Sequence, residues 1–288
     1  MITKAYGGKV IITFNEAKHY YTVKAPSVFK DTLYQPSVTG IIGMKDKSGA
    51  LVHWATEQFA EKMKAMIHEA QPEYLQPDLL AALVDVAKDT WRVSKQQAAD
   101  IGTIAHRVFE ERLEGREVSL PLQFDPIVAA HMTQDMIDQA NNAVEAGLKF
   151  IREHEIKVVQ AEAVRWSPTY GYIGTGDLIA YIDGKLSVAD WKTSKRLYPT
   201  VRLQLSAYKH AYEEEYPEQE IEQRVAINTG KDGTLSYEVH DNTTHANDLD
   251  VFLALQKTWR WDRENQGQWS KEAPRQLTPE EVAKILNN

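Results

Sequence analysis

The sequence predicts an α+β or mixed α/β fold, in which a mixed sheet is flanked by helices. Three observations support this class. From residue 48 to residue 153 apolar residues recur at helical spacing, and from residue 156 they follow the period of strands. Asp183-Gly184 separates two stretches rich in apolar and β-prone residues, the strongest short-range signal for a hairpin. A helical segment at 200–216 then precedes two further strand-like segments.

The first part of the chain, residues 1–47, is expected to hold a β-hairpin and an entry segment. Its two strands are predicted at residues 9–14 and 18–24, which are rich in β-branched and aromatic residues and are separated by a short polar turn. Residues 48–155 are expected to form a helical block.

Start and stop signals divide the helical block. A first helix is predicted over 48–69 and is followed by two prolines. Asp78 is expected to cap a second helix. Ser94 with Gln97 three residues later has the form of a capping box, opening a third helix that would stop at Gly115. The last helical pattern covers residues 127–153.

The third part, residues 156–266, is expected to carry the sheet. Strands are predicted at 156–166, on both sides of Asp183-Gly184, and around Gly-Lys-Asp-Gly at 230–233, with helices at 200–216 and 244–266. In the tail, residues 267–288, the run Thr278-Pro-Glu-Glu starts a short helix.

Composition narrows the function classes. The chain has 288 residues, a formal net charge of −8 and no cysteine. Without cysteine there is no disulfide, thiol catalysis or iron–sulfur cluster, which fits a reducing, cytoplasmic setting. No signal-peptide pattern occurs, and no stretch approaches the roughly 20 apolar residues of a membrane span. The acidic balance argues only weakly against a nucleic-acid partner, because a local basic groove suffices to bind phosphate.

The Asp183-Gly184 hairpin carries an acid at the outer end of each strand. If these two residues form the turn, Ile182 faces Lys185, and counting outward places Asp177 opposite Asp190. Opposed carboxylates about 5 Å apart repel each other. They can hold a divalent cation, because Mg²⁺ and Mn²⁺ prefer oxygen ligands. The alternative is a solvated surface hairpin with an ordinary lysine–aspartate pair.

Lys192 follows Asp190 by two positions, so both side chains project from the same face of the strand, while Trp191 points toward the core. Glu162 lies in the preceding strand and reaches the same site if that strand pairs with the hairpin; otherwise it is a solvated glutamate. His106, in a helix that also contains the helix-disfavouring Gly102, is either a metal ligand or an ordinary helical histidine.

Polar and basic residues follow the hairpin. Gln204 and Tyr208 share a helix face and either point at the site or pack on the sheet. A local basic excess suits a phosphate backbone, although each charge could equally be ordinary surface. Its members are Arg165, Lys192, Lys195, Arg196, Arg202 and Lys209. No glycine-rich phosphate loop, G-x-S-x-G elbow or H-E-x-x-H motif occurs.

Five short segments in order resemble the RecB-like branch of the PD-(D/E)XK nucleases. They are GTIAH, AEAVRW, GTGD, DWKTSK and QLSAY. PSVTGII followed by ALVHWA is similar to the N-terminal part of phage-encoded and mitochondrial genome-maintenance exonucleases of this branch. The resemblance covers roughly residues 36–265 and implies a restriction-endonuclease-like core. Gly176 stands where the strict motif has proline, as is common in this branch.

The resemblance also implies roles. Asp177 and Asp190 would bind the metal with His106 and the Trp191 backbone carbonyl, and Glu162 would aid the metal or water. Lys192 would orient the attacking water. Gln204 and Tyr208 would support the site and contact DNA. Independently of the resemblance, Arg165, Lys195 and Arg202 of the local basic excess are expected to contact phosphate. Unlike relatives with a four-cysteine iron–sulfur cluster, this chain cannot hold one.

The expected function is Mg²⁺-dependent hydrolysis of DNA, with Mn²⁺ able to substitute, by an exonuclease of recombination, repair or replication. The helical block would arch over the site and admit a strand end, and a recombination or replication protein would be a partner. Two alternatives stay open. One is a structure-specific or restriction-type endonuclease, and the other is a non-catalytic DNA-binding accessory protein on the same fold.

Overall fold

The computed structural model describes residues 1–288 except 19, 46–47, 70–75, 123–131, 266–274 and 288. Its first sheet is antiparallel and has the order β1-β2-β3-β4. The strands are β1 (Ile2–Ala5), β2 (Val10–Asn15), β3 (Tyr20–Lys24) and β4 (Leu33–Gln35). The predicted hairpin is confirmed as β2 and β3. The two outer strands were not predicted, because three or four residues are too few to show a period.

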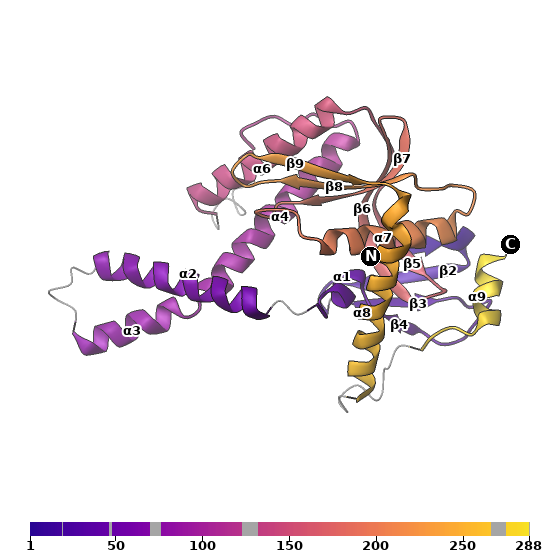
Figure 1. The fold of residues 1–288 in the computed structure, drawn as a ribbon, viewed down its shortest axis with the longest axis horizontal. Helices are drawn as coiled ribbons and strands as arrows, with labels where there is room; N and C mark the ends of the chain where they lie inside the picture. Colours follow the sequence, from indigo (N-terminus) through magenta and orange to yellow (C-terminus); the bar gives the residue numbers. More distant parts are fainter. Residues whose placement is uncertain (19, 46–47, 70–75, 123–131, 266–274, 288) are drawn as a thin grey trace.

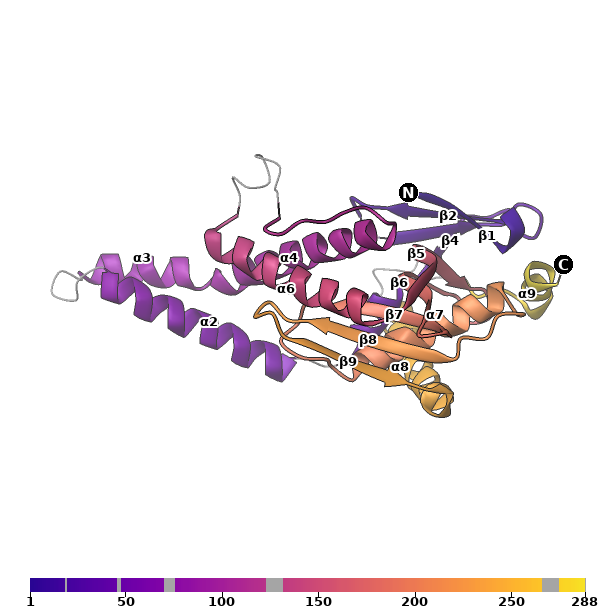
Figure 2. The same ribbon diagram turned by 90° about the horizontal axis from the view of Figure 1, so that it is seen from above.

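The helices of the next part are α1 (Val38–Ile42), α2 (Ser48–Glu69), α3 (Pro77–Ala87), α4 (Thr90–Leu113) and α6 (Gln134–Glu153). Figure 1 shows α2 and α3 extending away from the two sheets, whereas α4 runs back toward them. From above, α2 and α3 again lie beyond the end of the second sheet (Figure 2). The helical block as a whole therefore does not form the arch over the site that was expected from the sequence.

Two predicted helix starts are wrong. Asp78 does not cap α3, which begins at Pro77 after Gln76. Ser94 lies inside α4 instead of opening a helix, and its hydroxyl donates to the Gln58 side chain on α2 at 2.9 Å. The Ser94 hydroxyl, which the sequence predicts as a helix cap, therefore forms a contact between two helices instead. Helix α6, the last of the helical block, begins at Gln134 with Thr133 as its cap. Residues 127–131 of its predicted range lie outside the described residues.

The second sheet has the order β5-β6-β7-β8-β9, in which only β7 and β8 are parallel. Its strands are β5 (Ile156–Ser167), β6 (Tyr172–Ile182), β7 (Lys185–Lys192), β8 (Gln223–Thr229) and β9 (Leu235–His240). Helix α7 (Thr200–Glu215) makes the crossover between β7 and β8, as a parallel connection requires. Helices α8 (His245–Asn265) and α9 (Pro279–Leu286) follow. The predicted fold class and the predicted elements of this half are confirmed.

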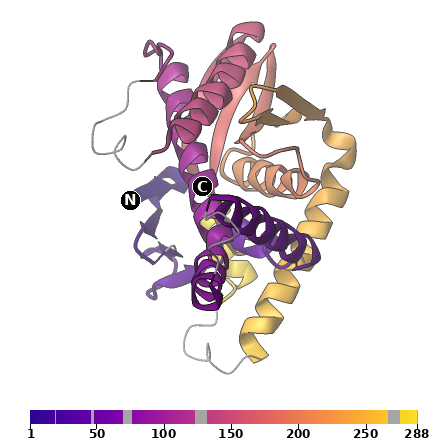
Figure 3. The same cartoon turned by 90° about the vertical axis from the view of Figure 1, so that its left-hand side faces the viewer.

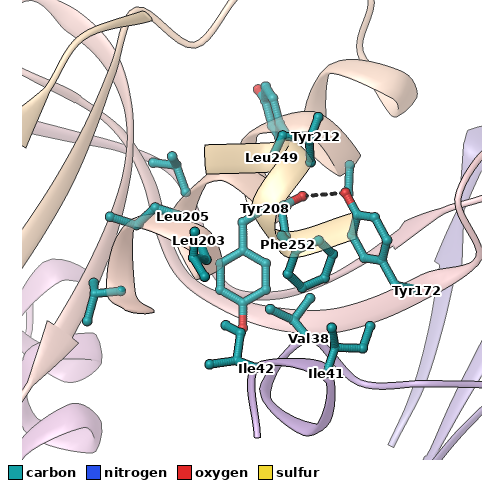
Figure 4. Packing of buried hydrophobic residues seen from close by; sticks show 14 of the residues in the cluster. Val38, Ile41, Ile42, Tyr172, Leu203, Leu205, Tyr208, Tyr212, Leu249 and Phe252 are labelled. Atoms are coloured by element: carbon teal, nitrogen blue, oxygen red, sulfur yellow. Dashed lines mark hydrogen bonds between the residues drawn. The ribbon is translucent and has the colours of Figure 1, made fainter. Parts of the chain in front are cut away.

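Helices cover both faces of the second sheet (Figure 3). On one face Ile179 and Val188 pack with α1, α7 and α8, and Figure 4 shows Tyr208, Tyr172 and Phe252 in this cluster. On the other face Leu178 packs with α4 and α6. Successive side chains of a strand point to opposite faces, and both faces are covered, so the central strands are buried at nearly every position, as in β7.

The first sheet packs against the ends of β5 and β6. Trp166 and Ile173 lie in one buried cluster with Val10 and Val23 of the first sheet and with Ile285 of α9. The division of the chain into four parts stays a prediction, and α4 and α6 share a core with the second sheet. Within the described residues, no helix has the length and apolar character needed to cross a membrane.

Candidate metal-binding site

The hairpin between β6 and β7 has the predicted register. Ile182 pairs with Lys185, and the ladder continues to Leu178 with Ala189. Asp183 and Gly184 have φ values of 51° and 82°, so both central residues adopt the left-handed conformation that a tight two-residue hairpin turn needs. Asp177 and Asp190 are the next residues along the two strands, one step beyond the last paired residues.

A third acid lies beside this pair. Ala161 pairs with Leu178 and Ala163 with Gly176, so Glu162 on β5 stands opposite Asp177. Glu162 has a φ of 47°, an uncommon conformation for a residue other than glycine that is costly unless its surroundings impose it. Three neighbouring strands therefore each bring one carboxylate to the same place, and β5 is locally distorted there.

Helix α4 adds an imidazole. One ligand atom from each of His106, Glu162 and Asp177 can be chosen so that all three lie within 4.8 Å of one another. His106 Nδ1 lies 3.5 Å from Asp177 Oδ2. One nitrogen and two carboxylate ligands in this arrangement suit a divalent cation such as Mg²⁺ or Mn²⁺. The metal that the sequence led us to expect fits these residues.

The electrostatics of the acids favour a cation. Burial and the charge of Asp190 raise the pKa of Asp177 to about 6, against the opposing influence of His106 and Lys192. Burial, followed by the charges of Asp177, Glu110 and Asp190, raises the pKa of Glu162 to about 7. Negative charges that are crowded and partly desolvated bind protons more tightly, and a divalent ion would offset the same repulsion.

Asp190 is engaged differently from the other two acids. It is fully buried, forms a close ion pair with Lys192 and accepts a hydrogen bond from Gln204 Nε2 at 2.9 Å. Burial lowers the pKa of Lys192, but the charges of Asp190 and Asp177 and the hydrogen bond to Asp190 outweigh it, so the net shift is upward. Lys192 is thus held charged beside the acids.

The helix after β7 supports this pair. Gln204 also donates to the Tyr208 hydroxyl at 3.2 Å, so Gln204 points toward the site. Tyr208 is buried in the core cluster, so its expected contact with DNA does not fit the structure. The Trp191 backbone N–H donates to Asp177 Oδ2 at 2.8 Å. Its ring is buried and lies 4.5 Å, centre to centre, from Phe109. The ligand role expected for the Trp191 carbonyl stays a prediction.

Two expected phosphate contacts do not fit the structure. Arg165 is buried, lies 3.8 Å from Glu215 and stacks on Tyr212. Arg202 binds Asp248 with 3.0 Å between Nη2 and Oδ1. Both guanidinium groups are therefore paired with carboxylates of the protein itself, and the spacing of residues in the sequence could not show these partners.

Lys195 is different, because it is exposed and lines a cavity together with His106 and Lys192. Among the expected phosphate-contacting residues, it is the one whose surroundings suit that role.

Two glycines and a tyrosine complete the surroundings of the site. At Gly102 a Cβ atom would lie 3.2 Å from Thr193 Oγ1, so the close approach expected there brings α4 against the segment after β7. At Gly174 a Cβ would lie 2.8 Å from Tyr208 Cε1. The Tyr21 hydroxyl lies 3.0 Å from Thr175 Oγ1, which ties the first sheet to β6. Gly174 and Tyr21 were missed because nothing local to either residue marks such a contact.

Clustered carboxylates beside a charged lysine can hold a divalent cation and a phosphate group together, as a metal-dependent nuclease requires. The family model described as the PD-(D/E)XK nuclease superfamily matches residues 41–283. The chain belongs to this superfamily, so its general activity is that of a nuclease acting on DNA, and members are typically dependent on divalent metal.

Other comparisons add little. No curated protein matches the chain. Among solved structures, the one titled "Crystal structure of SSO0001" matches with 14% identity over 62% of this chain and 97% of that chain. Its TM-score is 0.21, which is too low to carry a structural argument. The narrower likeness to the RecB-like branch and to phage and mitochondrial exonucleases stays a prediction.

Proposed function

We propose that the chain is a Mg²⁺-dependent DNA exonuclease, with Mn²⁺ able to replace Mg²⁺. The observation that supports this best is the convergence of His106, Glu162 and Asp177 beside the Asp190–Lys192 ion pair. The first three would bind the ion, with Asp190 and the Trp191 carbonyl as further ligands. When bound, a divalent ion polarises the phosphoryl oxygen, lowers the pKa of an attacking water and stabilises the leaving oxygen.

The protein's own groups supply the positioning. Lys192 would donate to an oxygen of the scissile phosphate and orient the attacking water. Asp190 and Gln204 would hold its ammonium group, since Asp190 contacts both. Glu162 has two carboxylate oxygens, so one can bind the ion while the other accepts a proton from that water. The water oxygen bonds to phosphorus, the bond to the leaving oxygen breaks, and that oxygen takes a proton from solvent, while Glu162 later returns its proton to solvent.

The exonuclease assignment rests on the resemblance of the N-terminal segments and not on the catalytic geometry, which an endonuclease would share. The setting expected from the same resemblance, recombination, repair or replication with a protein partner, remains a prediction.

End-dependence tests the assignment. We expect nucleotide release from linear single- or double-stranded DNA with Mg²⁺, and no cutting of covalently closed circles. Rapid cutting of closed circles would establish the endonuclease alternative. Asp190→Ala should abolish release, and Lys192→Ala should slow it strongly. If the wild type binds DNA but releases nothing under these conditions, the accessory-protein alternative holds.

A further inference from the structure

A cavity of about 650 Å³ opens beside the proposed metal site. Helix α4 lines it at Ala98 and Ala99, and the turn between β8 and β9 lines it at residues 230–232. His106 and Lys192 belong to both the cavity and the metal site. The volume falls within the range of about 300–1,000 Å³ typical of small-ligand sites, which suits a nucleotide.

The cavity is basic in an acidic chain. Lys195 and Lys231 line it in addition to Lys192, and Asp232 is its acidic member. The Asp232 carboxylate accepts hydrogen bonds from the Thr234 amide and hydroxyl, at 3.0 and 2.6 Å. In the part of the chain that the structure describes, neither Lys195 nor Lys231 has a carboxylate within ion-pair distance, whereas Lys192 has Asp190. Two cations are therefore left for an anionic ligand.

The fold holds Lys231 in place. Its Nζ donates to the Ala98 carbonyl at 3.4 Å, across the cavity wall, and its own carbonyl accepts from Asn142 Nδ2 at 3.2 Å. The turn closes through Gly230 N–H to the Thr234 carbonyl at 2.7 Å, and Gly233 has a φ of 84°. Burial lowers the pKa of Lys231. A partly desolvated ammonium with one neutral partner gains by meeting a phosphate.

We propose that this cavity binds the nucleotides next to the scissile phosphate as a single strand, with Lys231 of the β8–β9 turn and Lys195 of the segment after β7 contacting the sugar-phosphate backbone. Lys231 is a positioning residue, and the contact is independent of base identity. The Lys231–Ala98 contact joins α4 to the turn at one side of the cavity. Because the cavity volume of about 650 Å³ lies in the small-ligand range, we infer room for one strand and not for a duplex. The proposal depends on the proposed nuclease function only for the place of the scissile phosphate beside Lys192.

Binding without added metal tests the proposal independently of cleavage. Fluorescence anisotropy would compare a labelled single-stranded oligodeoxynucleotide with a duplex closed by loops at both ends. Lys231→Ala and Lys231→Gln should weaken single-strand binding roughly tenfold, the effect of losing one charge-assisted hydrogen bond. The slope of log affinity against log salt should become shallower by about 0.7. Lys231→Arg should keep most of the wild-type affinity and most of the wild-type salt slope.

Lys185→Ala is the matched control. Lys185 is exposed and lies at the far end of β7, about 23 Å from Lys192 at roughly 3.3 Å per residue. The Lys185→Ala variant should bind the single strand as the wild type does. The proposal is overturned if the Lys231 variants, with unchanged melting temperatures, keep the wild-type affinity for the single strand and the wild-type salt slope. It is also overturned if they lose affinity for the closed duplex by the same factor as for the single strand, or if the wild type does not bind the single strand. A chain that cleaves no DNA but binds it through Lys231 would refute the nuclease function alone.

Discussion

Glu162 on β5 stands opposite Asp177 on β6, and both carboxyl groups have pKa values raised well above those of free side chains. The fold holds two acids together, with a third, Asp190, adjacent in the same sheet. Such an arrangement lowers stability unless protons or a cation are bound, because the charges repel and are partly desolvated. The site is thus maintained for function at the expense of stability.

The first prediction concerns stability against pH without metal. The folded-state pKa of Glu162, about 7, exceeds its unfolded value, so the folded chain binds more protons between about pH 4.5 and 7. The free energy of unfolding should therefore fall as pH rises through this window. Glu162→Gln should raise it at pH 8 by on the order of 1–2 kcal/mol after allowance for solvent screening. Denaturant titration in EDTA measures this.

Glu145→Gln is the control for this experiment, because Glu145 is exposed on α6. It should leave both the stability and its pH dependence unchanged. A Glu162→Gln variant that is less stable than the wild type at pH 8 would contradict the repulsion described above.

The second prediction concerns the metal. The ligands must be deprotonated to bind it, so Mg²⁺ should raise the melting temperature more at pH 8 than at pH 6. Asp177→Asn should abolish this stabilisation and His106→Ala should weaken it. An Asp177→Asn variant that Mg²⁺ stabilises as strongly as the wild type would show that the ion binds elsewhere.

The third prediction concerns the lysine. Lys192→Ala should lower kcat by about 10²–10⁴-fold, the usual range for loss of a group that moves a proton or stabilises transition-state charge. Gln204→Ala, which loosens Asp190 without removing the ammonium group, should cost about 10–100-fold. Lys185→Ala should leave kcat unchanged. Single-turnover cleavage of end-labelled DNA separates these effects, and a Lys192→Ala variant of normal kcat would remove this residue from the chemistry.

The fourth prediction compares two glycines on β6. A Cβ at Gly174 would lie 2.8 Å from Tyr208 Cε1 and 3.1 Å from Val38 Cγ2, whereas at Gly176 the nearest atom would be 3.5 Å away. Gly174→Ala should therefore destabilise the chain by about 1–3 kcal/mol through overpacking, and Gly176→Ala should be tolerated. Thermal unfolding tests the pair, and equal melting temperatures would contradict the packing argument.

Local rules determined the central part of the site. The turn at Asp183-Gly184 and the two-residue period of its strands set which residues face each other, and the same period placed Lys192 beside Asp190. The helix that carries Gln204 and Tyr208 followed from its own apolar spacing. These features depend on neighbours within a few residues, so the sequence alone was sufficient to predict them.

Only the tertiary structure decided the rest. It buried Arg165 against Glu215, put Glu162 in a left-handed conformation and gave Ser94 a partner on another helix. It also joined Lys231 to Ala98, 133 positions apart in the chain. Such contacts arise from how helices and sheets pack, and no local period or turn signal specifies which distant side chains meet.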